Sequence, residues 1–484
     1  MKVKEIFFLA LLTAGAFLVQ GYHPYVDDAA FYVPMVKKAL DPSLYPRGAE
    51  FFQSHAKLTL FPNLAAGAVR LLHLPLDPTL LLLHLASIFL FLLACWKVSC
   101  ACFELAEARW CAVTLMAATL TVPVAGTALF IFDHFLNPRS FAAFAAMFAV
   151  AAALERRYWV AGLWLAGAGL VHPLMPVYGL FFVFLLWWNR RTESGAAVIA
   201  ARAAFAPLGI SFEPPTPAYH QAALRHAFHY VVQWTWYQWV GIWGPLVALF
   251  AIFRVARARR MENVMLLCRS LALLVLVSLA GALILDIPAR FEALARFQPL
   301  RSLHLTYVLL FILVGGMLGQ FVLKRSAARW LLLFVPLCAG LWALQLGNFP
   351  ASAHIEWPGA ASRNAWVNAF EWIRGNTPDD AYFALDPLHM EIPGEDVHGF
   401  RAIAERSMLA DMVKDSGAVS MFPGLAEEWW EQVSAQDGWK TFQVADFERL
   451  KARYGVDWVV VEQPGTAGLN CPYQNATVRV CRLN

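Results

Sequence analysis

Long apolar segments recur along the first 347 residues of this 484-residue chain. A membrane-spanning helix needs about 20 predominantly apolar residues, and about eleven segments approach that pattern before residue 348. Hydrophobic residues make up 59% of the chain and charged residues only 15%, against about 25% charged residues in soluble proteins. These features predict a polytopic, mainly α-helical membrane protein, and they exclude a soluble globular, collagen-like or disordered chain.

The positions of the positive charges predict the orientation of these segments. The expected spans lie near residues 5–22, 79–101, 110–131, 139–154, 158–172, 174–188, 195–211, 237–253, 264–285, 304–323 and 330–347. With this count every basic connector falls on one side, which the positive-inside rule makes cytoplasmic. The segment 195–211 is the weakest candidate. It is kept because an odd total number of spans leaves the basic connectors on one side. The first segment lacks a clean cleavage site, so we interpret it as a retained span rather than a secretory signal.

The charge balance divides the chain into two parts. Residues 1–347 carry 27 Lys and Arg against 15 Asp and Glu, whereas residues 348–484 carry 11 against 19. A basic apolar part joined to an acidic part of ordinary composition predicts a transmembrane domain (1–347) and a soluble extracytoplasmic domain (348–484), not a nucleic-acid-binding protein. Periodicity in the second part predicts a small α/β domain. Its expected elements are helices 363–375, 424–435 and 444–454 and strands 381–385, 457–462 and 477–482.

Two cysteines stand apart from the others. Cys471 and Cys481 lie in the polar C-terminal part, whereas the other six lie in or beside apolar segments. An odd number of spans with a cytoplasmic N-terminus places the C-terminal part outside, where disulfides form. A hairpin closed by Cys471 and Cys481 is therefore expected.

The first expected outer loop, residues 23–78, begins with an acidic pair. His23, Asp27 and Asp28 follow the first span directly, where ionised groups are costly and commonly functional. The alternative is that Asp28 only caps the next helix. The pattern predicts interfacial helices over 29–40 and 61–74.

Other outer connections hold further polar candidates. The second outer loop concentrates Asp133, His134, Asn137 and Arg139, although Asn137 and Arg139 have a structural alternative as a helix start and a snorkelling side chain. His172 lies in the next outer turn, where a helix-end role is the simpler interpretation. The loop near 286–303 carries Arg290, Arg296 and Arg301. Arginines on the outer side suit an anionic ligand such as a phosphate, with structural ion pairs as the alternative.

This order of features resembles the GT-C superfamily of membrane glycosyltransferases, which take sugars from polyprenyl-phosphate donors at the outer face. The resemblance rests on the acidic pair Asp27 and Asp28 after the first span, flat helices in the first outer loop, the acidic second loop and a late basic loop before an outer C-terminal domain. The chain lacks a clear DxD sequence in its second outer loop and a Trp-Trp-Asp sequence in its tail, which puts metal dependence in doubt.

The resemblance implies an inverting glycosyl transfer with Asp27 or Asp28 as the catalytic base. Arg296, Arg301, His134 and Arg139 are then expected to bind the donor phosphate. The expected supporting residues are His23, Asp133, His172, Arg401 and Arg406. The outer domain is expected to cover the cavity as a lid, with Arg401, Arg406 and Asp411 facing the cavity. The alternative for these three residues is an ion network within that domain. A divalent metal, Mg or Mn, on Asp28 and Asp133 stays open.

The implied partners are a polyprenyl-phosphate-sugar donor, membrane lipids and an acceptor whose nature stays open. The implied location is the bacterial inner membrane, with the N-terminus cytoplasmic and the C-terminal domain periplasmic. Two other classes of function stay open: a transporter or lipid-handling protein, and a non-catalytic subunit of a membrane complex.

Overall fold

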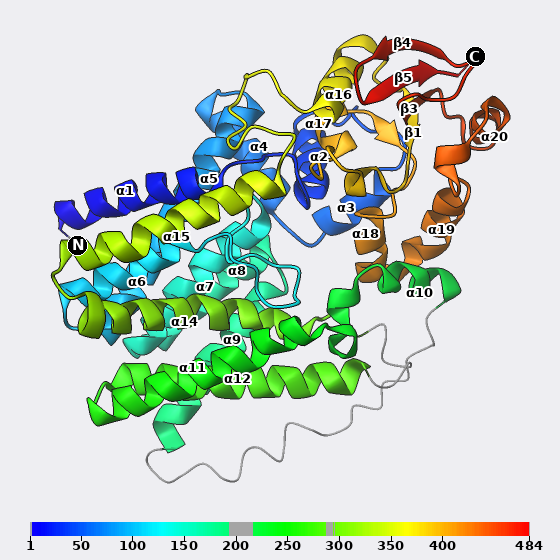
Figure 1. Ribbon diagram of the computed structural model, residues 1–484. Helices are drawn as coiled ribbons and strands as arrows, with labels where there is room; N and C mark the ends of the chain where they lie inside the picture. Colours follow the sequence, from blue (N-terminus) through cyan, green and yellow to red (C-terminus); the bar gives the residue numbers. More distant parts are fainter. Residues whose placement is uncertain (1, 193–215, 287–293, 295, 484) are drawn as a thin grey trace.

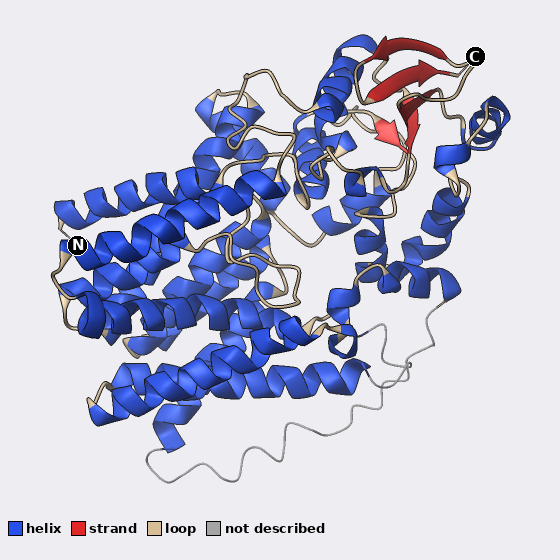
Figure 2. Cartoon of the chain, in the orientation of Figure 1, coloured by secondary structure: helices blue, strands red, loops and turns tan. Residues whose placement is uncertain are grey.

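A bundle of apolar helices forms the larger part of the computed structural model, which describes residues 2–192, 216–286, 294 and 296–483 (Figures 1 and 2). The bundle helices are α1 (Val3–Gln20), α5 (Leu76–Cys102), α6 (Ala106–Ala118), α7 (Pro138–Leu154), α8 (Tyr158–Val171), α9 (Met175–Thr192), α11 (Trp236–Ala258), α12 (Glu262–Asp286), α14 (Leu303–Leu318) and α15 (Ala327–Asn348). One continuous hydrophobic core joins α1, α5 to α9, α11, α12 and α14. The chain is therefore mainly α-helical, as predicted.

Six segments within the described residues are long and apolar enough to cross a membrane. They are Val3–Gln20, Leu76–Cys102, Trp236–Ala258, Glu262–Asp286, Pro299–Leu323 and Ala327–Asn348. Two further apolar helices, α7 and α8, are shorter. The predicted count of eleven is not confirmed, and the predicted span 195–211 lies outside the described residues.

The predicted span 110–131 is wrong in its second half. Helix α6 ends at Ala118, and residues 119–137 form turns in which Pro123 pairs with Phe130. Two threonines and Val122 precede Pro123 there, and proline both lacks an amide hydrogen and disfavours helical geometry in the residue before it. The connection between α6 and α7 is therefore longer than the sequence indicated.

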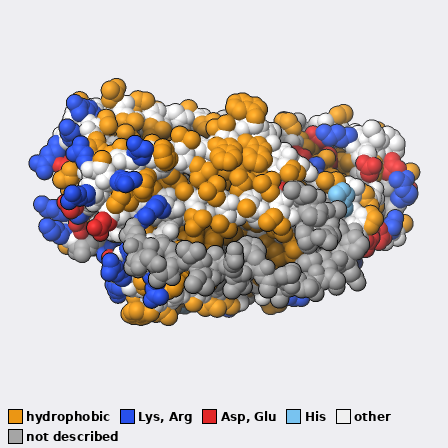
Figure 3. Space-filling model, turned by 90° about the horizontal axis from the view of Figure 1, so that it is seen from below, with side chains coloured by type: hydrophobic (Ala, Val, Ile, Leu, Met, Phe, Trp, Pro, Cys, Tyr) orange, Lys and Arg blue, Asp and Glu red, His pale blue; other side chains and the backbone are white. Residues whose placement is uncertain are grey.

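The basic connectors meet at one end of the bundle. Arg190 donates to the carbonyl oxygens of Ala153 and Leu154, each at 2.8 Å, and Asn263 donates to the carbonyl oxygen of Ala101 at 2.7 Å. These contacts bring the ends of α5, α7, α9 and α12 together. Figure 3 shows Lys and Arg gathered at the end of the molecule that carries the N-terminus, next to a broad apolar surface. This distribution matches a multi-pass membrane protein.

Three helices of the first loop lie at the opposite end of the bundle. They are α2 (Ala29–Leu40), α3 (Glu50–Ala56) and α4 (Phe61–Leu72). Helix α2 has the bounds that the sequence predicts, and α4 ends two residues earlier than predicted. Buried residues of α2 and α4 share a hydrophobic cluster with Leu80 of α5 and Val171 of α8. This packing fixes the first loop on the bundle.

Residues 349–483, called here the C-terminal region, combine a five-stranded sheet with short helices. The helices are α16 (Ala365–Asn376), α17 (Phe400–Ala404), α18 (Asp415–Met421), α19 (Ala426–Ser434) and α20 (Val444–Tyr454); the strands are β1 (Tyr382–Leu385), β2 (Ser407–Met408), β3 (Trp458–Glu462), β4 (Asn470–Gln474) and β5 (Val478–Arg482). The strand order is β2-β1-β3-β5-β4, parallel around β1 and antiparallel from β3 onward. The predicted α/β pattern is present, but β2 and β4 were not predicted.

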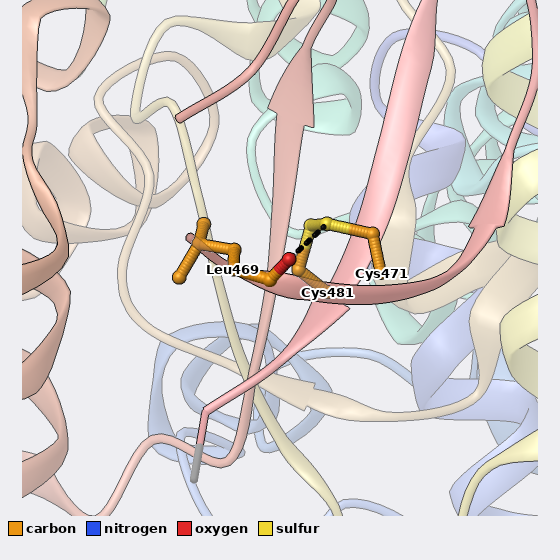
Figure 4. The surroundings of a disulfide bond; sticks show 3 residues. All are labelled: Leu469, Cys471 and Cys481. Carbon is orange, nitrogen blue, oxygen red and sulfur yellow. Dashed lines mark hydrogen bonds between the residues drawn. A yellow bond between two sulfur atoms is a disulfide. The ribbon is translucent and has the colours of Figure 1, made fainter. Parts of the chain in front are cut away.

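A disulfide joins Cys471 and Cys481 across the β4–β5 pair (Figure 4). The carbonyl oxygen of Leu469 lies 3.6 Å from the sulfur of Cys471. Strand β4 is an edge strand, and its pairing with β5 is irregular between Asn470 and Tyr473, a position where Pro472 is tolerated. Proline within the segment concealed this strand from sequence analysis.

The C-terminal region packs on the first loop as well as on itself. Phe51 of α3 shares a hydrophobic cluster with Val419 and Trp429, and Tyr219 of α10 (Pro217–Leu224) belongs to the same cluster. A second cluster joins Phe31 and other first-loop residues to Ala418. Helix α18 is therefore held between the C-terminal core and the end of the bundle.

Candidate functional site

A cavity of about 330 Å³ lies at the end of the bundle opposite the basic connectors. Its wall is built from five parts of the chain: the first loop, the start of α7, the turn between α8 and α9, residues around 225–229, and the segment from Gln298 to Arg301. Residues 413–421 of the C-terminal region close a further side. The volume is at the lower end of the range typical of small-molecule sites.

The predicted acidic pair lies on this cavity. Asp28 occupies the N-cap position of α2, but its carboxylate caps no backbone amide of that helix. Instead its Oδ2 accepts from Arg139 at 2.6 Å and its Oδ1 from the Lys414 Nζ at 3.0 Å. Asp27 also accepts from Lys414, and its backbone has a φ of +52°, a left-handed conformation that Asp tolerates better than most residues. The capping alternative for Asp28 therefore fails.

The two carboxylates titrate differently. Burial raises the pKa of Asp27, and the nearby Lys414 offsets this only in part. Burial also acts to raise the pKa of Asp28, but Lys414 and Arg139 outweigh it and hold that pKa well below its usual range. Adjacent groups whose pKa values are pushed apart are suited to different roles.

Arg139 is placed by two carboxylates from different loops. Asn137 caps α7 by accepting from the Ser140 amide at 3.1 Å, so the predicted helix start is correct. Arg139 then donates through Nε to Asp133 Oδ2 at 3.1 Å as well as to Asp28. Asp133 therefore orients Arg139 from outside the cavity.

The geometry does not fit the metal site considered for Asp28 and Asp133. The guanidinium of Arg139 lies between these carboxylates and contacts both. Asp133 Oδ2 also accepts from the Asn137 amide at 2.6 Å. Within the ranges that the structure describes, no group of three or more His, Cys, Asp or Glu residues could hold a metal ion.

Arg301 is the cation of the cavity that is left without an acidic partner in the described parts of the chain. Its guanidinium lies over the Phe228 ring, 5.6 Å from the centroid, and its buried Nε has no hydrogen-bond partner. Both residues line the cavity. Arg301 therefore keeps hydrogen-bond donors available for an anion.

Neutral imidazoles line the wall between Arg301 and the acidic pair. Burial lowers the pKa of His172 to about 3 and those of His55 and His226 to about 4. His172 also accepts from the Met175 amide at 3.3 Å, the helix-end role that the sequence allowed. These side chains add polar atoms to the cavity without adding charge.

Two predicted histidines lie away from the cavity. His23 stacks on Phe349 with ring centroids 3.8 Å apart, and His134 bonds to Gln345 at 2.7 Å and packs edge-on against the same ring. Both are buried where the end of α1 meets the end of α15. The structure therefore does not place His134 with the phosphate-binding candidates, because aromatic packing and the glutamine already engage its ring.

Three further predicted arginines, Arg296, Arg401 and Arg406, have structural partners. Arg296 donates to the Met421 carbonyl oxygen at 3.2 Å and does not line the cavity, while Arg290 lies outside the described residues. Arg406 donates to the carbonyl oxygens of Arg374 and Thr377. Arg401 forms a bidentate pair with Asp415 at 2.8 and 2.9 Å. The ion-network alternative thus describes Arg401 and Arg406 better than a position on the cavity.

Lys414 is a site residue that sequence analysis missed. It lies 386 residues after Asp28 and belongs to no recognisable pattern. The available signal was local: Asp411 precedes it by three residues, a spacing at which an aspartate can bond the following backbone amides. That signal predicts a turn, not the partner of the lysine.

The sequence matches no protein-family model, and no curated protein matches it. The solved structures that are similar to this chain include two of an archaeal oligosaccharyltransferase. Archaeal oligosaccharyltransferase AglB from Archaeoglobus fulgidus, in complex with an inhibitory peptide and a dolichol-phosphate, matches with a TM-score of 0.50 and 13% identity over 95% of this chain and 69% of that chain. The oligosaccharyltransferase from the same organism in the apo form matches with a TM-score of 0.46 and 11% identity over 94% and 69%.

The bundle and its end cavity define the chain as a multi-pass membrane protein. Its fold is similar to that of AglB, which is a member of the GT-C superfamily. The resemblance drawn from the sequence is therefore confirmed for the fold. At 13% identity the similarity carries no residue assignments.

Proposed function

We propose that this protein is a membrane glycosyltransferase that moves a sugar from a polyprenyl-phosphate-linked donor to an acceptor at the outer face of the membrane. The observation that carries the proposal is the cavity itself, with a carboxylate pair on one side and the unpaired Arg301 on another. A base and an anion site in one cavity are what glycosyl transfer from a phosphate requires. The dolichol-phosphate bound to AglB supports the same class of donor.

In the proposed reaction an acceptor oxygen or nitrogen forms a bond to the anomeric carbon while the bond from that carbon to the phosphate oxygen breaks. The phosphate leaves with the electron pair, and the proton of the acceptor passes to Asp27 or Asp28. Attack opposite the leaving group inverts the anomeric centre. Arg301 stabilises the departing phosphate, and Arg139 holds Asp28 in its ionised form.

The proposed topology places the basic connectors and the N-terminus in the cytoplasm and the cavity outside. Residues 1–347 then form the transmembrane domain, and residues 348–484 an extracytoplasmic domain that covers the cavity with α18. The Cys471–Cys481 disulfide suits an oxidising compartment such as the bacterial periplasm. The positive-inside rule supports this orientation.

The proposal is tested by mass spectrometry of lipids bound to the detergent-purified protein. Wild type is expected to retain a polyprenyl phosphate or its sugar conjugate, and Arg301→Ala to retain at least tenfold less, because removal of a charge-assisted phosphate contact costs about 1.5–3 kcal/mol. Arg296→Ala is the matched comparison from the same segment, and it is expected to keep the lipid because Arg296 faces Met421. Ordinary phospholipid alone in every sample would contradict the proposal and favour a lipid-handling protein or a complex subunit.

The pH dependence of transfer decides between the two candidate bases. A base must be deprotonated to act, so the rate falls as pH drops through its pKa. If Asp27 is the base, its raised pKa puts the acid limb of kcat/KM above the ordinary aspartate value of about 3.9. If Asp28 is the base, the limb lies below that value. The measurement is a profile of initial rates between pH 4 and 8. We expect the acid limb that lies above the ordinary aspartate value, with Asp27 as the base.

A further inference from the structure

The cations beside the acidic pair occupy the place where a divalent metal was considered. Asp28 offers one carboxylate oxygen to Arg139 and the other to Lys414, and Asp27 also binds Lys414. Asp133 is engaged by Arg139 and Asn137. A divalent ion ligated by Asp28 and Asp133 would lie against the guanidinium of Arg139, where like charges repel.

The position of Lys414 is set by a buried polar turn. Asp411 Oδ1 accepts from the backbone amides of Val413 at 2.8 Å, Lys414 at 2.5 Å and Asp415 at 3.2 Å. Asp415 in turn accepts from the Asp411 amide at 2.9 Å and from both terminal nitrogens of Arg401. The backbone that carries the ammonium is therefore fixed before any ligand arrives, which limits the reorganisation that binding requires.

We propose that Lys414 is the built-in counter-cation of Asp27 and Asp28 and takes the part that a divalent metal would have there. The inference deepens the proposed function and rests on it. Lys414 compensates the two carboxylates so that the phosphate of the donor can bind at Arg301 in the same cavity. Donor binding then needs no added metal.

Charge balance explains why the lysine matters for an anionic ligand. Arg139 is shared with Asp133, so Lys414 is the side chain that compensates Asp27. Without the ammonium, the cavity presents an additional uncompensated carboxylate to the phosphate. Two adjacent carboxylates left in this way offer the hard oxygen ligands that Mn²⁺ and Mg²⁺ prefer. Loss of Lys414 should therefore turn a metal-independent site into a metal-dependent one.

The test compares wild type, Lys414→Met and Lys414→Arg in the full-length detergent-purified protein after treatment with EDTA. Retention of added polyprenyl phosphate is measured by native mass spectrometry with and without Mn²⁺, and bound Mn²⁺ by electron paramagnetic resonance. Wild type and Lys414→Arg should retain the lipid equally with or without Mn²⁺. In EDTA, Lys414→Met should retain at least tenfold less polyprenyl phosphate than wild type. Added Mn²⁺ should restore most of this retention.

Lys440→Met is the control, because Lys440 is an exposed lysine of the same region, pairs with Glu462 and does not line the cavity. Stoichiometric Mn²⁺ in wild type that disappears in Asp28→Asn would overturn the inference, and so would unchanged retention in Lys414→Met. If wild type binds no polyprenyl phosphate at all, the proposed function fails. The Mn²⁺ measurement still decides whether Lys414 keeps the metal out. The rescue by Mn²⁺ separates a charge effect from misfolding of Lys414→Met.

Discussion

Asp28→Asn is expected to lower sugar transfer by about 10²- to 10³-fold, the range typical for the loss of a preorganised electrostatic contact in an active site. Asp28 bonds both cations beside the acidic pair, with Arg139 on one oxygen and Lys414 on the other. An asparagine has the same shape but accepts through a single oxygen and carries no charge. The substitution therefore removes the anion that Arg139 and Lys414 share.

The measurement is the initial rate of transfer from a polyprenyl-phosphate-linked sugar, together with the thermal unfolding midpoint of each variant. Asp41→Asn is the matched control, because Asp41 belongs to the same loop but its carboxylate bonds Ser43 and is not part of the cavity lining. Asp41→Asn should keep the wild-type rate. An Asp28→Asn protein that folds and transfers at the wild-type rate would remove Asp28 from the site.

Much of the fold could be predicted because its cause is local. An apolar run of about 20 residues specifies a helix without knowledge of its neighbours. Helical periodicity does the same for the shorter helices α2, α16 and α20, which are found within two residues of their predicted bounds. The predicted span 110–131 is wrong for an equally local reason. The prediction followed hydropathy alone and gave no weight to the helix-breaking effect of Pro123. Strand β4 was missed because Pro472 is acceptable only on an edge, and the sequence does not show which strand is the edge.

The candidate site was only partly predictable. Asp27, Asp28 and Arg301 stood out because charged groups beside apolar segments are costly, and the structure brings them to one cavity. The same reasoning also selected His134, and the expected lid over the cavity selected Arg401. Their partners Gln345 and Asp415 make them structural. A chemically suitable side chain becomes a site residue only when the fold brings it to the cavity. That condition depends on tertiary contacts, which no local pattern encodes.

The buried pair of Arg401 and Asp415 links the stability of the C-terminal region to the site. Both side chains are at most 6% exposed, and the guanidinium is bidentate on the carboxylate. Arg401→Met is expected to destabilise this region by about 3–5 kcal/mol, because it leaves the carboxylate of Asp415 buried without a cation. Since Asp415 holds the turn that presents Lys414, retention of polyprenyl phosphate should fall together with stability.

Limited proteolysis and chemical denaturation of the purified protein measure the first effect, and native mass spectrometry the second. Arg374→Met is the control, since Arg374 is 42% exposed and pairs with Glu405 at 3.7 Å, an arrangement that contributes about 0–1 kcal/mol. Arg401→Met combined with Asp415→Asn should recover part of the stability, because the unpaired charge is removed with its partner. Recovery of stability without recovery of lipid retention would show that the pair serves the site by positioning Lys414. An Arg401→Met protein as stable as wild type would mean that the C-terminal region does not depend on this pair. The hydrophobic contacts of α18 with the first loop would then be what links the fold of the region to the cavity.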